Sequence, residues 1–184
     1  MKKGISAVTV ALVAFALLLA GCGGDSSTGN ASAATTTSQH YTATLAALND
    51  SGVTGTADFT LTGNQLVINV KLNGATAKQG HAQHIHGTTG KQATCPTIAA
   101  IDKTGVVSLN AGGPYYGPVA LGLQPATASA SGAVDFTNTM TLKADDMAKI
   151  TPLNQHVYVI HGVLNKGKYD GLLPAACGAI TAAR

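Results

Sequence analysis

The sequence predicts an all-β domain, a Greek-key β-sandwich or flattened barrel. Between residues 40 and 184, apolar and polar residues alternate over short segments that Gly, Asn and Ser separate. Such alternation is typical of strands with one solvated face, and tight turns join these strands into antiparallel meanders. Aromatic residues make up 4% of the chain, Trp is absent and Gly occurs 22 times, which favours short strands over a helical bundle. The length suits one domain with its own core.

Most strands are predicted from alternation, and a further strand is expected to carry the histidines at 84 and 86. The predicted strands are 41–45, 53–61, 66–72, 105–109, 132–142, 157–160 and 177–181. The run Val157–Ile160 is almost continuously apolar, so this strand is expected to be central in the sheet. One short helix is predicted over 144–150. The segment 112–125 is expected to be a long loop, because Gly and Pro recur in it.

The first 21 residues have the pattern of a lipoprotein signal peptide. Lys2 and Lys3 precede an apolar run, Ile5–Ala20, that is short for a membrane-spanning helix. The run ends in LAGC at 19–22, which resembles the lipobox of bacterial lipoproteins. The resemblance implies cleavage before Cys22 and a lipid on that cysteine. An ordinary signal peptide that happens to precede a cysteine is the alternative.

The predicted organisation is a signal peptide over 1–21, a flexible tether over 22–39 and a β domain over 40–184. The tether is rich in Gly, Ala, Ser and Thr and has no large apolar residue to bury. No aspartate directly follows Cys22, which favours the outer membrane, with the domain in the periplasm or at the cell surface. Without the two signal lysines, nine basic residues stand against eight aspartates. Nucleic acid is therefore not an expected partner.

Export would place Cys95 and Cys177 in an oxidising compartment. With Cys22 assigned to the lipid, these two remain as an even pair, which suggests a disulfide bond. Two unpaired buried thiols are the alternative.

The histidines suggest a metal site. His84 and His86 stand two residues apart on a predicted strand, so they share one face of it. His161 ends another predicted strand and is the best third ligand, whereas His81 and His156 have the opposite parity on their strands. Three neutral imidazoles with one open position suit copper or zinc. Partly buried histidines satisfied by hydrogen bonds are the alternative.

Three segments resemble copper/zinc superoxide dismutases. GHAQHIH at 80–86 resembles their copper-binding strand, VYVIH at 157–161 their later strand that ends in a copper ligand, and ACGAI at 176–180 their C-terminal segment. The likeness extends over most of residues 41–181. It implies a dismutase-like fold, copper ligands at His84, His86 and His161, and a disulfide between Cys95 and Cys177.

The dismutase pattern is incomplete. Where the family has a histidine that bridges copper and zinc, GPYYGP at 113–118 has tyrosine, and no histidine occurs between His86 and His156. The zinc ligands are therefore missing and no zinc is expected. The segment PAA at 174–176 lacks the family's arginine, and Asn165 and Lys166 stand where an acidic residue is expected. Because the arginine would attract anionic superoxide, dismutation is expected to be weak or absent.

The chain also resembles bacterial CHRD domains, whose strands read YxAxL, GxAxFxL and HIHG. Residues 41–45, 55–61 and 84–87 fit these patterns. The leading hypothesis is an envelope lipoprotein that binds copper through three histidines, with no residue assigned a certain catalytic role. A non-catalytic CHRD-type binding or structural lipoprotein is the alternative, in which Tyr115 and Tyr116 cover the metal. An adhesion domain without metal is a third possibility.

Overall fold

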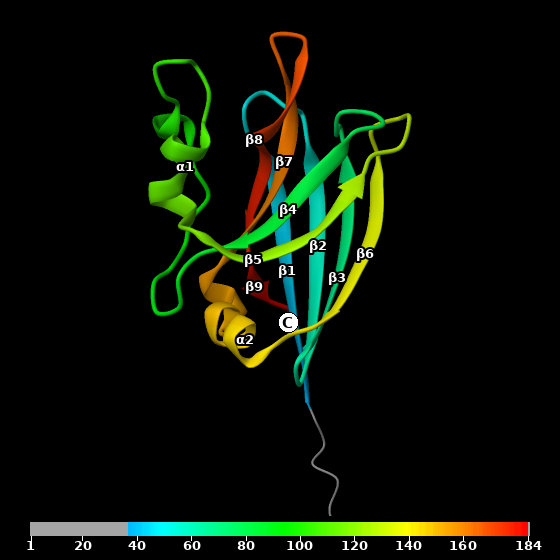
Figure 1. Ribbon diagram of the computed structural model, residues 1–184, viewed down its shortest axis with the longest axis vertical. Coiled ribbons are helices and arrows are strands. Elements are labelled where there is room, and N and C mark those ends of the chain that lie inside the picture. Colours follow the sequence, from blue (N-terminus) through cyan, green and yellow to red (C-terminus); the bar gives the residue numbers. More distant parts are fainter. Residues whose placement is uncertain (1–36, 184) are drawn as a thin grey trace, which may run out of the picture. The chain divides into compact units, whose positions relative to one another are not determined.

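The computed structural model describes residues 37–183, in which nine strands form one antiparallel sheet (Figure 1). The strands are β1 (Ser38–Ala47), β2 (Thr54–Thr62), β3 (Gln65–Asn73), β4 (Gly80–His86), β5 (Val119–Thr127), β6 (Val134–Thr141), β7 (Val157–Asn165), β8 (Lys168–Ala179) and β9 (Thr181–Ala182). Their order is β5-β4-β7-β8-β1-β2-β3-β6, and β9 pairs with β1. The helices are α1 (Leu109–Tyr116) and α2 (Ala144–Ile150), with 3-10 turns η1 (Ile98–Ala100) and η2 (Leu153–Gln155).

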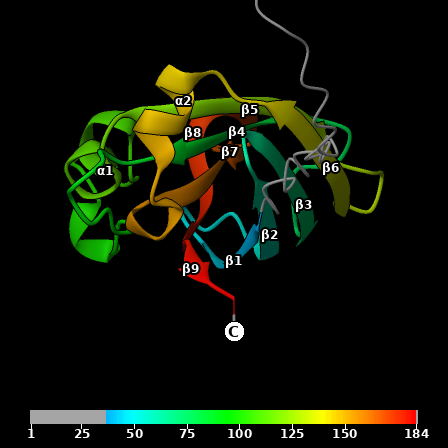
Figure 2. The same ribbon diagram turned by 90° about the horizontal axis from the view of Figure 1, so that it is seen from below.

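The sheet curls round on itself into a nearly closed, flattened barrel. Figure 2 shows β5 and β6 approaching each other across a seam where no strand pairing joins them. With the seam counted as a neighbour relation, β4, β5 and β6 are neighbours in space as they are in sequence, and β3 lies on the other side of β6. The spatial order β4-β5-β6-β3 is that of a Greek key. The predicted all-β class and flattened-barrel architecture are confirmed.

Strict alternation along the strands fills the inside of the barrel. In β3, the apolar side chains of Leu66, Ile68, Val70 and Leu72 are buried, whereas the residues between them are partly or fully exposed. Strand β7 lies between β4 and β8, so the prediction of a central strand at Val157–Ile160 is confirmed. The sheet can bury both faces of β7 because a second apolar layer covers it from outside.

That outer layer comes from the β4–β5 connection, residues 87–118, which lies against the outside of β7 and β8. A small buried cluster joins the two parts: Ala93, Tyr116, Val157, Val159 and Cys177, with Leu48 and Cys95 at its edge. Cys95 and Cys177 form a disulfide across this layer, with a Cα–Cα distance of 5.7 Å. The predicted disulfide is confirmed, and it holds the long connection to the sheet.

Two sequence predictions in this connection and beyond it are wrong. The segment 112–125 is not a loop, because it contains the end of α1 and most of β5. Ser108 caps α1 by accepting a hydrogen bond from the Ala111 amide, which offsets the weak helix propensity of the glycines. Pro125 fits in β5 because the strand is paired only with β4, at an irregularity in that pairing.

The predicted strand at 105–109 is also absent. Val107 is buried there, but its backbone pairs with a side chain and not with a strand. Asn49 donates from Nδ2 to the Val107 carbonyl (3.0 Å) and accepts from the Val107 amide (2.6 Å). Val107 is therefore buried without belonging to a strand pair, and Gly105 and Leu109 on either side of it are exposed. The helix predicted at 144–150 is confirmed as α2, and the strand predicted at 177–181 is split between the end of β8 and β9.

The N-terminal predictions lie largely outside the described residues. This holds for the signal peptide 1–21, Cys22 and most of the tether 22–39. The tether prediction is wrong at its end, because β1 begins at Ser38, whose hydroxyl lies 2.7 Å from that of Thr62 on β2. Within residues 37–183, no helix is long and apolar enough to cross a membrane.

Candidate metal centre

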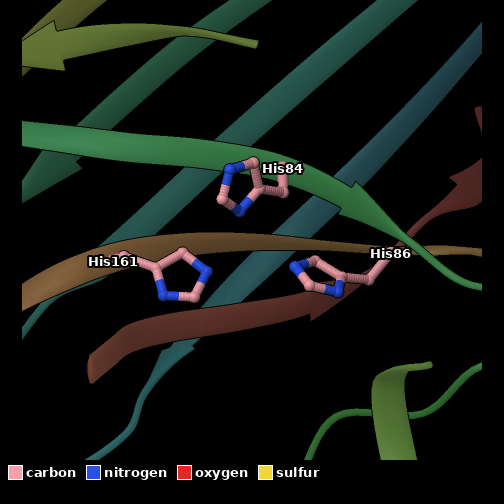
Figure 3. Close-up of side chains that lie close together, drawn as sticks. All are labelled: His84, His86 and His161. Carbon is pink, nitrogen blue, oxygen red and sulfur yellow. The ribbon is translucent and has the colours of Figure 1, made fainter. Parts of the chain in front are cut away.

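The candidate site lies on the outer face of the sheet, where β4 and β7 run side by side (Figure 3). His84 pairs with Val159 and His86 with Val157, so both imidazoles stand over the central strand. Ile85, between them, points into the barrel core. The i, i+2 spacing on a regular strand produces this division between the two faces.

His161 lies on the same outer face of β7 as Val157 and Val159, because it has their parity on the strand, whereas Tyr158 and Ile160 point into the core. The pairing of β7 with β8 shifts register on both sides of His161, and Gly162 beside it has φ +108°. A side chain at 162 would lie 2.9 Å from Nδ1 of His81 and would also collide with the Tyr169 hydroxyl, so only glycine fits this position.

The three rings meet closely enough to hold one metal ion. One ligand nitrogen from each ring lies within 4.8 Å of the others. The ring centroids are 5.4 Å apart for His84 and His86, 5.0 Å for His84 and His161, and 6.0 Å for His86 and His161. With metal–nitrogen bonds of about 2.0–2.1 Å, ligand nitrogens on one ion lie at most about 4.2 Å apart. Small side-chain movements therefore complete the site.

Backbone carbonyls orient two of the rings. Nδ1 of His86 lies 3.0 Å from the Gly117 carbonyl oxygen, and Nδ1 of His161 lies 2.9 Å from the Leu172 carbonyl oxygen. A carbonyl oxygen can only accept, so each Nδ1 must carry the hydrogen. Each Nε2 is then left with a free lone pair, as in a histidine whose second nitrogen binds a metal.

The free lone pairs are buried and have no partner. In the described part of the chain, four buried side-chain polar atoms lack a hydrogen bond: Nδ1 of His84, Nε2 of His86, Nε2 of His161 and Nδ2 of Asn138. Buried polar atoms are nearly always hydrogen-bonded, so three orphaned nitrogens in one place form a group that could bind a metal ion. The alternative of ordinary hydrogen-bonded histidines does not describe these three.

The other buried histidines provide the contrast. Both ring nitrogens of His81 lie near carbonyl oxygens, of His161 at 2.9 Å and Thr76 at 3.1 Å. Both nitrogens of His156 likewise lie near the carbonyls of Pro152 and Lys149. His81 and His156 therefore serve the packing of the barrel and stay outside the metal group, whereas His40 is exposed on β1 beside Thr60.

The site keeps its imidazoles neutral. Burial, as the largest cause, and repulsion from the neighbouring rings of His161 and His84 together lower the pKa of His86 to about 4, against the raising effect of the Gly117 carbonyl. Burial also lowers the pKa of His84 and, together with the nearby His84 ring, that of His161. Neutral imidazole is the form that binds metal, so the rings are ready to bind at neutral pH.

Acid is therefore expected to destabilise the metal-free protein before its carboxylates titrate. The pKa of His86 is lower in the folded chain than its ordinary 6.5, so the unfolded chain binds protons more readily. The contribution of neutral His86 to the free energy of unfolding is fully present above pH 6.5 and is lost as the pH falls from there toward 4. From pH 7.5 to 5, His86 alone accounts for a loss of about 2 kcal/mol. Urea unfolding with a chelator present measures this loss. Equal slopes against pH in wild type and His86→Ala would contradict it.

A small pocket of about 160 Å³ opens over the three rings. Its wall is completed by Ala82, Leu109, Val119, Gly171 and Leu172. Tyr116 lies against the inner side of the site, buried, with its ring centroid 4.6 Å from that of His86. Its hydroxyl donates to the Leu109 carbonyl at 3.3 Å. Tyr115 is only partly buried, so of the two tyrosines it is Tyr116 that packs on the site.

Sequence reasoning did not find the groups that support the ligands. The carbonyls of Gly117 and Leu172 carry no side-chain signal, and Leu109 and Val119 lie in segments predicted wrongly. Comparison of the chain with models of known protein families finds no match, and comparison with curated protein sequences finds none of significant similarity. The geometry of the three histidines is thus the main basis for a functional proposal.

Proposed function

We propose that this protein is an exported, lipid-anchored lipoprotein of the cell envelope whose superoxide-dismutase-like domain binds copper through His84, His86 and His161. The observation that carries the proposal is the convergence of three buried, unpartnered imidazole nitrogens. The N-terminal pattern with Cys22 supports the anchor. The order of the three motifs along the sequence and the Cys95–Cys177 disulfide support the dismutase-like part of the proposal.

The donor set favours copper among the metals of the envelope. Imidazole nitrogen suits copper and zinc, and copper(II) binds nitrogen sites more tightly than zinc. A thiolate is not available in the described chain, because Cys95 and Cys177 are paired. Carboxylates are not part of the group either. Calcium and magnesium, which take oxygen ligands, therefore do not fit.

Dismutation by this site is proposed to be weak or absent. Bound copper would supply one-electron chemistry by cycling between Cu(I) and Cu(II). Among residues 37–183, however, no Lys or Arg side chain lines the pocket over the three histidines. Superoxide would therefore reach the site without steering by protein cations, which can otherwise raise association rates by 10-fold or more. Apolar Leu109, Val119 and Leu172 stand at the mouth and disfavour an anion.

The close packing of Tyr116 on His86 favours a second candidate, a non-catalytic copper-holding or CHRD-type lipoprotein. A covered ligand suits retention of the ion better than rapid exchange of substrate. The two functions share the same ligands and differ only in turnover.

Metal analysis together with a superoxide assay tests the proposal. The full chain, exported with its disulfide intact, is expected to bind about one copper per molecule, since three histidines with an open position hold one ion in catalytic metal sites. The double variant His84→Ala/His161→Ala is expected to lose it, and His40→Ala to retain it. Consumption of superoxide by the copper-loaded wild type that is lost in the double variant supports dismutation. Copper without such activity supports the holding function, and a wild-type chain without copper would sink both.

A further inference from the structure

The pocket over the three histidines is uncharged as well as apolar. Its wall consists of the imidazoles and of Ala82, Leu109, Val119, Gly171 and Leu172. No acidic or basic side chain of residues 37–183 belongs to this wall. A metal ion there would meet three neutral donors and no compensating anion.

The carboxylate of the β7–β8 hairpin, that of Asp170, makes a hydrogen bond outside the pocket. Asp170 accepts a hydrogen bond from the backbone amide of Leu172 (3.0 Å) and does not line the pocket. It therefore supports the turn of chain that presents the Leu172 carbonyl to His161, and it is not placed to ligate. Asp102, in the β4–β5 connection, is likewise engaged by Thr104.

Charge then distinguishes the two oxidation states of copper. The free energy lost when an ion leaves water rises with the square of its charge, so Cu(II) pays a much larger desolvation cost than Cu(I). An anionic ligand or a nearby carboxylate normally offsets that cost, and this pocket has neither. The three neutral imidazoles satisfy Cu(I), which accepts three ligands, whereas Cu(II) prefers four in a tetragonal arrangement.

We infer that the site holds copper as Cu(I) in preference to Cu(II). The inference rests on the proposed copper binding and adds the oxidation state that the pocket selects. It assigns a role to the exposed apolar residues at the mouth, Leu109, Val119 and Leu172, whose side chains are 42%, 51% and 68% exposed. They keep charge and water away from the ion and so stabilise the state of lower charge.

Competition titrations measure the two affinities separately. Cu(I) is supplied anaerobically against a chromogenic Cu(I) chelator, and Cu(II) is supplied in air against an amino-acid chelator. The full chain is expected to bind Cu(I) at least about 100-fold more tightly than Cu(II), a ratio that corresponds to a difference of about 2.8 kcal/mol in binding free energy. Equal affinities, or tighter binding of Cu(II), would overturn the inference and leave copper binding intact. Failure to bind either ion would instead overturn the proposed function.

A matched pair of variants tests the physical cause. Leu172→Asp adds a carboxylate at the mouth without touching the backbone carbonyl that orients His161, and Leu172→Asn adds the same shape without charge. Leu172→Asp is expected to lower the Cu(I)-to-Cu(II) affinity ratio about tenfold through its attraction for the extra positive charge. Leu172→Asn is expected to leave the ratio within about twofold of the wild-type value, because it adds no net charge. An equal change in both variants would show that polarity of the side chain, and not charge, sets the preference.

Discussion

Replacing His161 by alanine is expected to lower the affinity for copper by more than about 100-fold. Loss of a group that merely orients a ligand costs about 10- to 100-fold in metal affinity, and loss of the ligand itself removes a metal bond. His161 is the only ligand from β7, so its loss leaves two donors on a single strand. Two donors cannot enclose the ion between strands. Titration of the metal-free protein with copper measures the effect.

The stabilising effect of copper is expected to disappear with its affinity. A ligand that binds only the folded chain stabilises it by about 2.7 kcal/mol at a concentration 100 times its Kd. Thermal melting with and without copper should therefore separate wild type from His161→Ala. His161→Gln is the second variant, because its amide can still donate to the Leu172 carbonyl while it lacks the imidazole nitrogen. His40→Ala, on the exposed face of β1, is the control. Full copper binding by both His161 variants would contradict the proposed ligand set.

Removing the disulfide is expected to weaken both the fold and the metal site. The double variant Cys95→Ala/Cys177→Ala opens a loop closed over a separation of 82 residues. In the chain-entropy model this costs about 4 kcal/mol, which would lower Tm by about 10 °C for a domain of this size. Urea and thermal unfolding of the metal-free protein measure the change.

The same variant is expected to lower copper affinity by about 10- to 100-fold. The disulfide holds the β4–β5 connection to β8, and this connection carries both Tyr116 and the Gly117 carbonyl. When the connection loosens, His86 loses the acceptor that sets its tautomer and the ring that packs on it. Wild-type protein treated with a reductant should match the variant, and the variant should not respond to the reductant. Unchanged copper affinity in a variant of lowered stability would show that the connection does not position His86.

The regular part of the fold could be read from alternation alone. The strands β2, β3 and β6 follow the predicted segments closely, and β1 contains its predicted segment and extends beyond it at both ends, since each buries one face and the pattern of burial has a period of two. The pairing of Cys95 with Cys177 was suggested by the cysteine count, once Cys22 is assigned to the lipid, and was implied by the dismutase resemblance. His84 and His86 share a face for the same local reason, their spacing on a strand.

Segments whose neighbours are distant in sequence could not be read in this way. The helix α1 and the strand β5 contain Gly and Pro, which signal a loop, and they form because the β4–β5 connection packs on the sheet and because β4 offers β5 a partner. The stretch at 105–109 alternates like a strand, yet Asn49 takes the place of a neighbouring strand. Local propensity is weak enough for tertiary contacts of this kind to override it.

The candidate metal site also has a part that follows from local sequence and a part that depends on distant contacts. The sequence by itself determined the three histidines and the shared face of two of them, because side-chain direction along one strand is a local property. Only the tertiary structure decided that β7 pairs with β4, which brings His161 to the other two histidines, and that their free nitrogens are left without partners. It also decided the uncharged wall and the carbonyls of Gly117 and Leu172 that orient the rings. These depend on backbone atoms and on segments brought together by folding, for which a residue's own chemistry carries no signal.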